Sequence, residues 1–149
     1  MGFNGRIPKK VLFMDVIQVY ATTLWVALAM GGLLLVQVVI SDLISIRAKH
    51  KPGFPVQPDH GSLLVRAARV YANTNETIAA FALFVIVGVH VAANPAWLNG
   101  FALVYLAGRV GHMLCYYLGQ PLLRSIGFGV SLLGLFGMFV VVAAAMLGS

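Results

Sequence analysis

The chain has 149 residues, of which 60% are hydrophobic and only 9% are charged. This composition excludes an ordinary soluble globular domain and predicts an integral membrane protein whose solvent is lipid. The formal charge of +6 comes from ten Lys and Arg residues against four Asp and Glu. Because most of these cations fall on loops and helix ends, we expect contacts with anionic membrane lipids and no binding of nucleic acid.

Four long apolar segments predict an all-α bundle of four transmembrane helices, since one crossing needs about 20 apolar residues. The predicted helices cover residues 11–46, 62–93, 96–118 and 122–147. Within the first segment, residues 11–18 are interpreted as an interfacial lead-in to the span. Because the remaining loops are short, we expect the whole chain, 1–149, to form a single membrane domain.

Loop and turn residues mark the ends of these helices. The first helix stops at a basic loop, 47–60, and Asp59 and Ser62 are candidate N-caps of the second. Asn94 and Pro95 are predicted to end the second helix, and Gly119, Gln120 and Pro121 to form the last turn.

Small residues recur in three of the predicted helices at spacings typical of close helix packing in lipid. They are Ala27, Gly31, Gly108, Gly111, Gly127, Ser131, Gly134 and Gly137. We expect them to pack inside the bundle or between subunits.

Four crossings place the two termini on one side of the membrane and the loop 47–60 on the other. The cations of the N-terminal segment and of the loop balance each other in number. Arg66, Arg69 and Arg124 lie near the loop side and favour a cytoplasmic loop, with the N- and C-termini opposite.

Polar residues also recur inside the spans, where ionisable groups are costly and usually functional. On the second helix a stripe within an arc of roughly 80° holds Arg66, Arg69, Asn73 and Glu76. On the third helix an arc of about 60° holds Arg109, His112 and Tyr116. Arg124 and Ser125 open the fourth helix.

The depth of two opposite charges predicts an ion pair. Glu76 lies roughly 20 Å along its helix from the loop side, and Arg109 lies roughly 14 Å from that side. Because a lone carboxylate at this depth would take up a proton, we expect Glu76 to be ionised and to face Arg109. Such a pair either fixes the helix register alone or forms part of a binding site.

Three further guanidiniums, those of Arg66, Arg69 and Arg124, have no acidic partner in the sequence pattern. Arginine presents a planar fork suited to carboxylates. Surplus cations around one polar mouth therefore predict an anionic ligand. A metal site is not expected, because His50 and His60 lie in the basic loop without a carboxylate cluster and Cys115 is the only cysteine.

Two motifs resemble a known family, the membrane-associated proteins in eicosanoid and glutathione metabolism (MAPEG), and within it the bacterial branch. Arg69, Asn73 and Glu76 stand in an R-x-x-x-N-x-x-E pattern. A second segment, from Arg109 through His112 and Tyr116 to Arg124 and Ser125, resembles the end of the family's third helix and the start of its fourth. The resemblance covers about residues 60–149 well and the first helix only in hydropathy.

The resemblance implies a homotrimer in a bacterial inner membrane that binds glutathione, as cosubstrate, between neighbouring subunits. The residues that would hold glutathione are Arg69, Asn73, Glu76, Arg109, His112 and Tyr116. Arg124 would stabilise the thiolate, with Ser125 beside it as a hydrogen-bond donor. A thiol with a pKa near 8.5 is only about 3% ionised at pH 7, and a cation that lowers this pKa by about two units makes the thiolate the majority species.

Two positions depart from the family pattern. Ala72 stands where some catalytic members carry a further arginine, and Phe128 where some carry a tyrosine near the thiol. These departures argue against an eicosanoid-specific activity, whereas conjugation of glutathione to lipophilic electrophiles or reduction of peroxides needs fewer groups.

The leading hypothesis is therefore a glutathione-dependent transferase or peroxidase whose lipophilic substrate lies in a groove between the first and fourth helices. The alternative is a non-catalytic membrane scaffold or accessory subunit of a larger complex, with the N-terminal segment as its docking element. A small channel or transporter is weaker, because the polar residues occupy one half of the bundle only.

Overall fold

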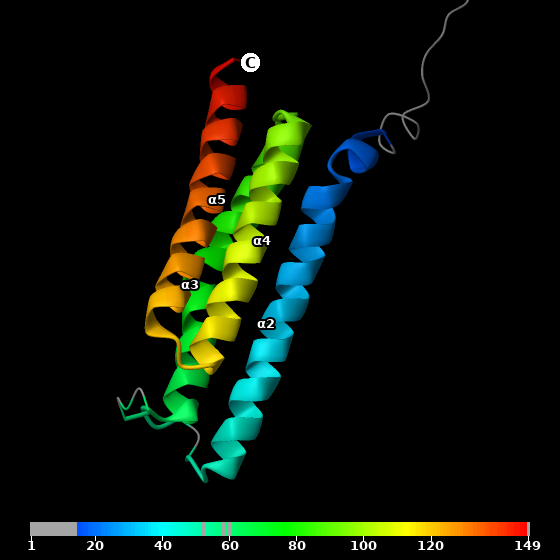
Figure 1. The fold of residues 1–149 in the computed structure, drawn as a ribbon. Helices are drawn as coiled ribbons and strands as arrows, with labels where there is room; N and C mark the ends of the chain where they lie inside the picture. Colours follow the sequence, from blue (N-terminus) through cyan, green and yellow to red (C-terminus); the bar gives the residue numbers. More distant parts are fainter. Residues whose placement is uncertain (1–14, 52, 58, 60, 149) are drawn as a thin grey trace, which may run out of the picture.

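The computed structural model describes residues 15–51, 53–57, 59 and 61–148. The described part is an elongated bundle of long helices (Figure 1). These helices are α2 (Ala21–Arg47), α3 (Leu63–His90), α4 (Pro95–Tyr117) and α5 (Pro121–Leu147). The predicted all-α fold is thus confirmed for these residues. The last three predicted helices are present with end shifts of at most three residues, whereas α2 begins ten residues after the predicted start of the first helix.

The two ends of the bundle differ in what they contain. The start of α2, the turn between α3 and α4, and the C-terminus lie at one end, here called the turn end (Figure 1). The loop between α2 and α3 and the turn between α4 and α5 lie at the other, here called the loop end. This grouping agrees with the predicted topology.

The first helix begins with a break at Tyr20. Residues 15–19 are helical, and Tyr20 leaves the helical geometry, with φ −102° and ψ 12°, before α2 starts. The Tyr20 hydroxyl donates a hydrogen bond to the backbone carbonyl of Ala93. This contact anchors the break close to the predicted boundary between the interfacial lead-in and the span. Residues 11–14 of the predicted helix lie outside the described part of the chain.

The turn between α3 and α4 corrects the prediction for Asn94 and Pro95. Helix α3 already ends at His90, and Ala92 adopts a positive φ of 51° in the turn that follows. The Asn94 side chain accepts hydrogen bonds from the amides of Ala96 and Trp97, at 3.1 and 3.3 Å. Asn94 is therefore the N-cap of α4 and Pro95 its first residue, because proline lacks only an amide that a helix start leaves unpaired.

The remaining helix ends follow the sequence more closely. Ser62 occupies the N-cap position of α3, although its side chain makes no capping hydrogen bond. Asp59 instead accepts a hydrogen bond from the amide of Gly61 at 2.9 Å. Gly119 turns the chain between α4 and α5 with a φ of 69°, a conformation that glycine adopts without strain.

Three of the helices, α2, α3 and α5, are long and apolar enough to cross a membrane. Helix α4 has the length of a span, 23 residues, but not the apolarity, because it carries Asn99, Arg109 and His112. It packs against α5, α2 and α3. The polar residues of α4 are thus largely covered by the other helices, with Arg109 fully buried and His112 4% exposed.

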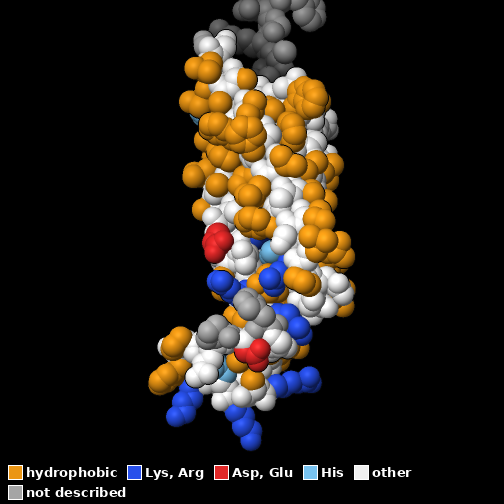
Figure 2. Space-filling model, turned by 60° about the vertical axis from the view of Figure 1, so that its left-hand side comes forward, with side chains coloured by type: hydrophobic (Ala, Val, Ile, Leu, Met, Phe, Trp, Pro, Cys, Tyr) orange, Lys and Arg blue, Asp and Glu red, His pale blue; other side chains and the backbone are white. Residues whose placement is uncertain are grey.

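The surface of the bundle is apolar along most of its length, and Lys and Arg gather at the loop end (Figure 2). Large side chains on every helix are exposed, among them Trp25, Leu35, Ile86, Trp97 and Phe136. In water such a surface would cause aggregation, whereas in a bilayer it faces lipid. The chain is accordingly an integral membrane protein.

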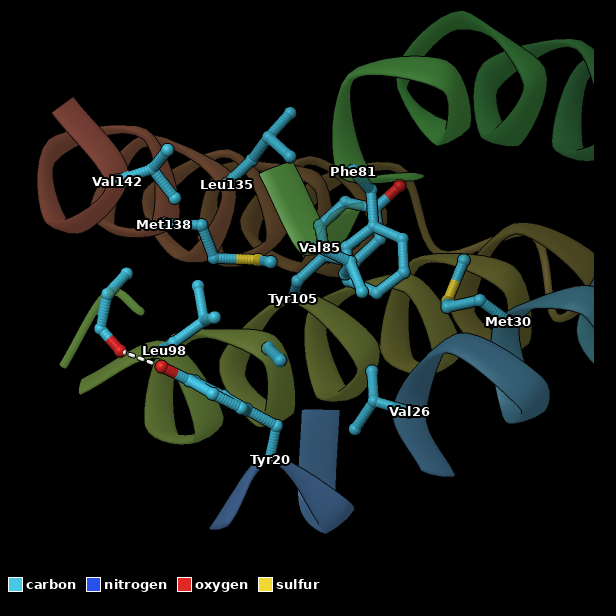
Figure 3. Packing of buried hydrophobic residues seen from close by; sticks show 12 residues of the cluster. Tyr20, Val26, Met30, Phe81, Val85, Leu98, Tyr105, Leu135, Met138 and Val142 are labelled. Atoms are coloured by element: carbon cyan, nitrogen blue, oxygen red, sulfur yellow. Dashed lines mark hydrogen bonds between the residues drawn. The ribbon is translucent and has the colours of Figure 1, made fainter. Parts of the chain in front are cut away.

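The buried core comes from the start of α2, the end of α3, the start of α4 and the end of α5, and so lies toward the turn end; Figure 3 shows its packing. At its centre the rings of Phe81 from α3 and Tyr105 from α4 stack with centroids 4.7 Å apart and planes 11° apart. The Tyr105 hydroxyl shares a 2.9 Å hydrogen bond with that of Thr77. Val26 and Met30 bring α2 onto the same cluster, which fixes α3, α4 and α2 relative to one another.

Glycines let α4 and α5 approach more closely than any other pair of helices. A Cβ atom at Gly127 would lie 2.6 Å from the amide nitrogen of His112, and one at Gly134 would lie 2.5 Å from that of Tyr105. Such separations leave no room for a side chain. Because small residues allow close helix contact in lipid, these positions set the spacing of α4 and α5 along most of their length.

The predicted small-residue packing is confirmed for α4 and α5 but not for every position. A Cβ at Gly108 would overlap the backbone of Ser131. Around Gly31 and Gly111, in contrast, no atom lies within 4 Å of such a Cβ. These two glycines do not mediate packing within one chain.

Candidate functional site

A polar pocket opens at the loop-end half of the bundle, between α3, α4 and α5. Its volume is about 330 Å³. The residues that line it are Arg69, Asn73, Glu76, His112, Tyr116, Arg124, Ser125 and Phe128. Every residue predicted to hold glutathione or to act on its thiol is among them except Arg109; Arg66 of the predicted polar stripe is also absent, and Phe128 is the addition.

The α3 wall of the pocket follows from helical periodicity. Arg69, Asn73 and Glu76 are four and three residues apart, a spacing that puts all three side chains on one face. The Asn73 amide donates a hydrogen bond to the carbonyl of Arg69 at 2.8 Å. The Arg69 and Glu76 side chains are exposed. In a lone chain this wall therefore presents a cation and an anion at an open mouth.

The opposite wall joins α4 to the first turns of α5. The Arg124 guanidinium lies 4.4 Å from the centroid of the Tyr116 ring, in a cation–π arrangement. His112 Nδ1 lies 2.8 Å from the carbonyl oxygen of Arg124. Ser125 Oγ donates to the carbonyl of Pro121 at 3.1 Å. The two residues predicted to act on a thiol thus stand beside two of those predicted to hold the ligand.

Arg109 lies behind this pocket instead of lining it. Its side chain is fully buried, and its three guanidinium nitrogens have no hydrogen-bond partner among the residues that the structure describes. Its Cζ lies 5.7 Å from the ring centroid of Phe128, which itself lines the pocket. A buried cation without partners is costly unless something pairs with it.

The predicted ion pair between Glu76 and Arg109 is wrong for a single chain. Glu76 is exposed on the pocket mouth, and the buried Arg109 forms no hydrogen bond or ion pair within the described part of the chain; the Glu76 carboxylate acts on it only electrostatically, from a longer distance. Equal depth along two helices does not fix rotation about their axes. The Arg109 guanidinium instead lies beside the Phe128 ring of α5, with its Cζ 5.7 Å from the ring centroid.

The MAPEG family model matches residues 22–144, a segment that runs from the start of α2 nearly to the end of α5 and contains every residue of the pocket. The chain belongs to the MAPEG family. This membership supports a membrane protein of the group that acts in glutathione and eicosanoid metabolism.

The MAPEG-like motif on α3 and the segment from α4 to α5 meet in one place. Residues about 40 to 50 positions apart in the sequence, such as Glu76 and Arg124, line the same pocket. Ala72, where some members carry arginine, does not line it, whereas Phe128, where some carry tyrosine, does. The pocket therefore has neither the additional arginine nor the tyrosine that some catalytic members carry at these two positions.

Arg66, the remaining residue of the predicted stripe, lies outside the MAPEG pocket. A Cβ at Gly119 would lie 3.1 Å from its Nη1 atom, so its guanidinium sits beneath the turn between α4 and α5. A larger hollow, of about 540 Å³, runs along the basic loop from Ala48 to Val65. None of the predicted site residues lines it.

Proposed function

We propose that this MAPEG protein is a glutathione-dependent membrane transferase or peroxidase that acts on lipophilic electrophiles. The observation that carries the proposal is the convergence of Arg69, Glu76 and Arg124 on one pocket. Arg69 matches a carboxylate and Glu76 the ammonium group of a small zwitterionic ligand such as glutathione, and Arg124 remains for its thiolate. The volume of about 330 Å³ is at the lower end of the range for small-molecule sites.

Each wall of the pocket has its own part in this proposal. Arg69 pairs with a carboxylate of glutathione, Glu76 with its ammonium group, and Asn73 with its peptide groups. His112 and Tyr116 form the α4 side. Arg109 does not line the pocket of the lone chain and lies beside the Phe128 ring that does, so in this proposal it reaches a carboxylate only after a rearrangement of that wall.

Arg124 and Ser125 carry the chemistry of the proposed reaction. The guanidinium lowers the pKa of the thiol by stabilising its thiolate, and the Ser125 hydroxyl donates a hydrogen bond to the sulfur. The thiolate then attacks the electrophile, forming a carbon–sulfur bond while the leaving group departs with its electron pair. The screening of Arg124 is weak at the hydrocarbon boundary, which strengthens its effect.

The proposed assembly is a homotrimer in a bacterial inner membrane, with the loop end in the cytoplasm. Arg69, Glu76 and Ser125 are exposed in a single chain, and a neighbouring subunit would close the pocket over them. Helix α2 packs against α3 and α4 rather than closely against α5. The predicted substrate groove between the first and fourth helices is therefore proposed to form between subunits.

The test is the ultraviolet absorbance of the glutathione thiolate in the purified membrane protein, together with conjugation of a lipophilic electrophile. Arg124→Ala should reduce the bound thiolate at pH 7 to about 3% of the glutathione and lower turnover by about 25-fold, the consequence of losing a pKa shift of about two units. Arg47→Ala, an exposed cation at the end of α2, is the control and should change neither. Wild-type protein that binds no glutathione but copurifies with a larger complex would favour the scaffold hypothesis instead.

A further inference from the structure

Two residues of α4 hold Arg124 of α5 from opposite ends. His112 contacts its backbone carbonyl, and Tyr116 contacts its guanidinium. The two are four residues apart and so lie on one face of α4. His112 and Tyr116 therefore do more than line the pocket, because together they constrain both the backbone and the side chain of the residue proposed to stabilise the thiolate.

The His112 contact fixes which ring nitrogen carries the proton. A carbonyl oxygen only accepts hydrogen bonds, so at 2.8 Å from the carbonyl of Arg124 the Nδ1 atom must be the donor. The Nε2 atom is buried and has no partner among the described residues. A second proton there would leave an unpaired buried N–H, which is costly, so the ring is neutral with its proton on Nδ1.

The same contact depends on the spacing of α4 and α5. A Cβ at Gly127 would lie 2.6 Å from the amide nitrogen of His112, so the helices touch within one turn of Arg124. The His112 ring also packs against Phe128, with centroids 5.7 Å apart, and against Tyr116, at 5.3 Å. The imidazole is thus held on both sides as well as at Nδ1.

The Tyr116 contact restrains the long side chain of Arg124. A free arginine loses about 2 kcal/mol of rotamer entropy when it is fixed in one geometry. The aromatic ring 4.4 Å from the guanidinium favours that geometry before any ligand binds. Preorganised charge is more effective than charge that must be reoriented at the moment of reaction.

We propose that His112 and Tyr116 are positioning residues, which fix the Arg124 guanidinium through its backbone and its side chain, and that the imidazole Nδ1 and the tyrosine ring are the groups that do so. This inference rests on the proposed function of Arg124 as the residue that stabilises the thiolate. It assigns His112 and Tyr116 a role through Arg124, where a role as direct ligands would depend on Nε2 and on the phenol hydroxyl.

The test compares two variants at each position in the full-length protein. Asparagine at 112 keeps a side-chain N–H donor near the Nδ1 position but lacks Nε2, and phenylalanine at 116 keeps the ring but lacks the hydroxyl. His112→Leu and Tyr116→Leu remove the positioning groups altogether. His90→Leu, an exposed histidine at the far end of α3, is the matched control.

The measurements are the pH midpoint of thiolate formation and the Kd for glutathione. His112→Leu and Tyr116→Leu should each raise the midpoint by about one pH unit, a tenfold loss of thiolate at a pH well below the midpoint, while Kd changes less than about threefold. His112→Asn and Tyr116→Phe should recover most of that loss. If Asn and Phe are as damaging as Leu, or if Kd rises with the midpoint, the positioning role is overturned.

A second measurement keeps the inference testable without glutathione. Nitrogen-15 NMR of labelled histidine should show His112 protonated on Nδ1 and not on Nε2, and the Arg124 Nε–H signal should lose a ring-current shift in Tyr116→Leu. Failure of wild-type protein to bind glutathione, with these signals present, would overturn the proposed function and leave the positioning intact. A proton on Nε2, or an Arg124 signal unaffected by Tyr116→Leu, would overturn the positioning itself.

Discussion

At the turn end of the bundle, buried and half-buried polar side chains have hydrogen-bond partners. Asn99 donates to the carbonyl of Val19 at 2.9 Å and accepts from the amide and hydroxyl of Thr23 at 3.0 and 2.7 Å. The Tyr20 hydroxyl donates to Ala93. These bonds tie the start of α2 to the start of α4 and keep the polar groups of a membrane helix paired.

Toward the loop end, several buried polar atoms have no partner within the described chain. They are Arg66 Nε, the three guanidinium nitrogens of Arg109, His112 Nε2, the Tyr117 hydroxyl, and the amide of Gln37 in α2. An unpaired buried polar group costs about 1–3 kcal/mol, and more when it is charged. The contrast teaches that one end is complete as a folded structure, whereas the other depends on a ligand, a neighbouring subunit or water.

The largest effect is expected where α4 and α5 meet near the turn end. Gly134→Ala would place a methyl group 2.5 Å from the Tyr105 amide nitrogen, so the helices must separate, at a cost of about 3 kcal/mol. Thermal unfolding in detergent should show the loss. Gly129→Ala, on the same helix but with no atom within 4 Å, is the control, and equal melting of the two variants would contradict the packing account.

The next largest effect is expected from breaking the hydrogen-bond network at the turn end. Asn99→Leu leaves the Val19 carbonyl and the Thr23 groups unpaired, and we expect a loss of about 2 to 3 kcal/mol in the free energy of unfolding. Asn75→Leu should cost almost nothing, because Asn75 is exposed and donates only to Tyr71 of its own helix at 3.2 Å. A small effect at Asn99 would show that this network does not hold α2 in place.

Substitution of Arg109 should stabilise the protein, in contrast to the two substitutions above. Arg109→Met removes a buried cation that has no hydrogen-bond partner among the described residues, so the ligand-free protein should become more stable by about 1–2 kcal/mol. The readout is the melting temperature without glutathione, with Arg47→Met as the exposed control. Strong destabilisation would mean that Arg109 is already paired in the assembled protein.

The smallest effect concerns the break before α2. Tyr20→Phe deletes the hydrogen bond to Ala93 and leaves that carbonyl unpaired, a loss of about 1 kcal/mol. Hydrogen exchange of the amides in 15–24 should rise in this variant while exchange in α5 stays unchanged. Uniform protection in both segments would indicate that the bond contributes nothing to anchoring α2.

The sequence predicted the helices well because hydropathy and turn residues act locally. Gly119 and Pro121 defined the turn between α4 and α5, and the spacing of Arg69, Asn73 and Glu76 placed them on one face. Asn94 was assigned to the wrong helix. Its N-cap role was readable, since asparagine before proline is a common helix start, but Pro95 was interpreted only as a terminator.

The pairing between helices could not be predicted in the same way. The depth of a residue along its helix follows from counting residues. The rotation of a helix about its axis depends on its close contacts with other helices, such as that of Gly127 with the backbone of His112. That rotation left Glu76 apart from Arg109. Phe128 as a pocket wall had a local signal, because it lies four residues after Arg124 and so on the same face of α5.

The central claim is that the loop-end pocket binds glutathione through its charged walls. The most direct measurement is the melting temperature of the detergent-solubilised protein with and without glutathione, for the wild type and for Glu76→Ala. A ligand that binds only the folded state must raise stability, by about 2.7 kcal/mol at 100 times its Kd. We predict that glutathione stabilises the wild type and not Glu76→Ala; equal behaviour of the two proteins would contradict the account.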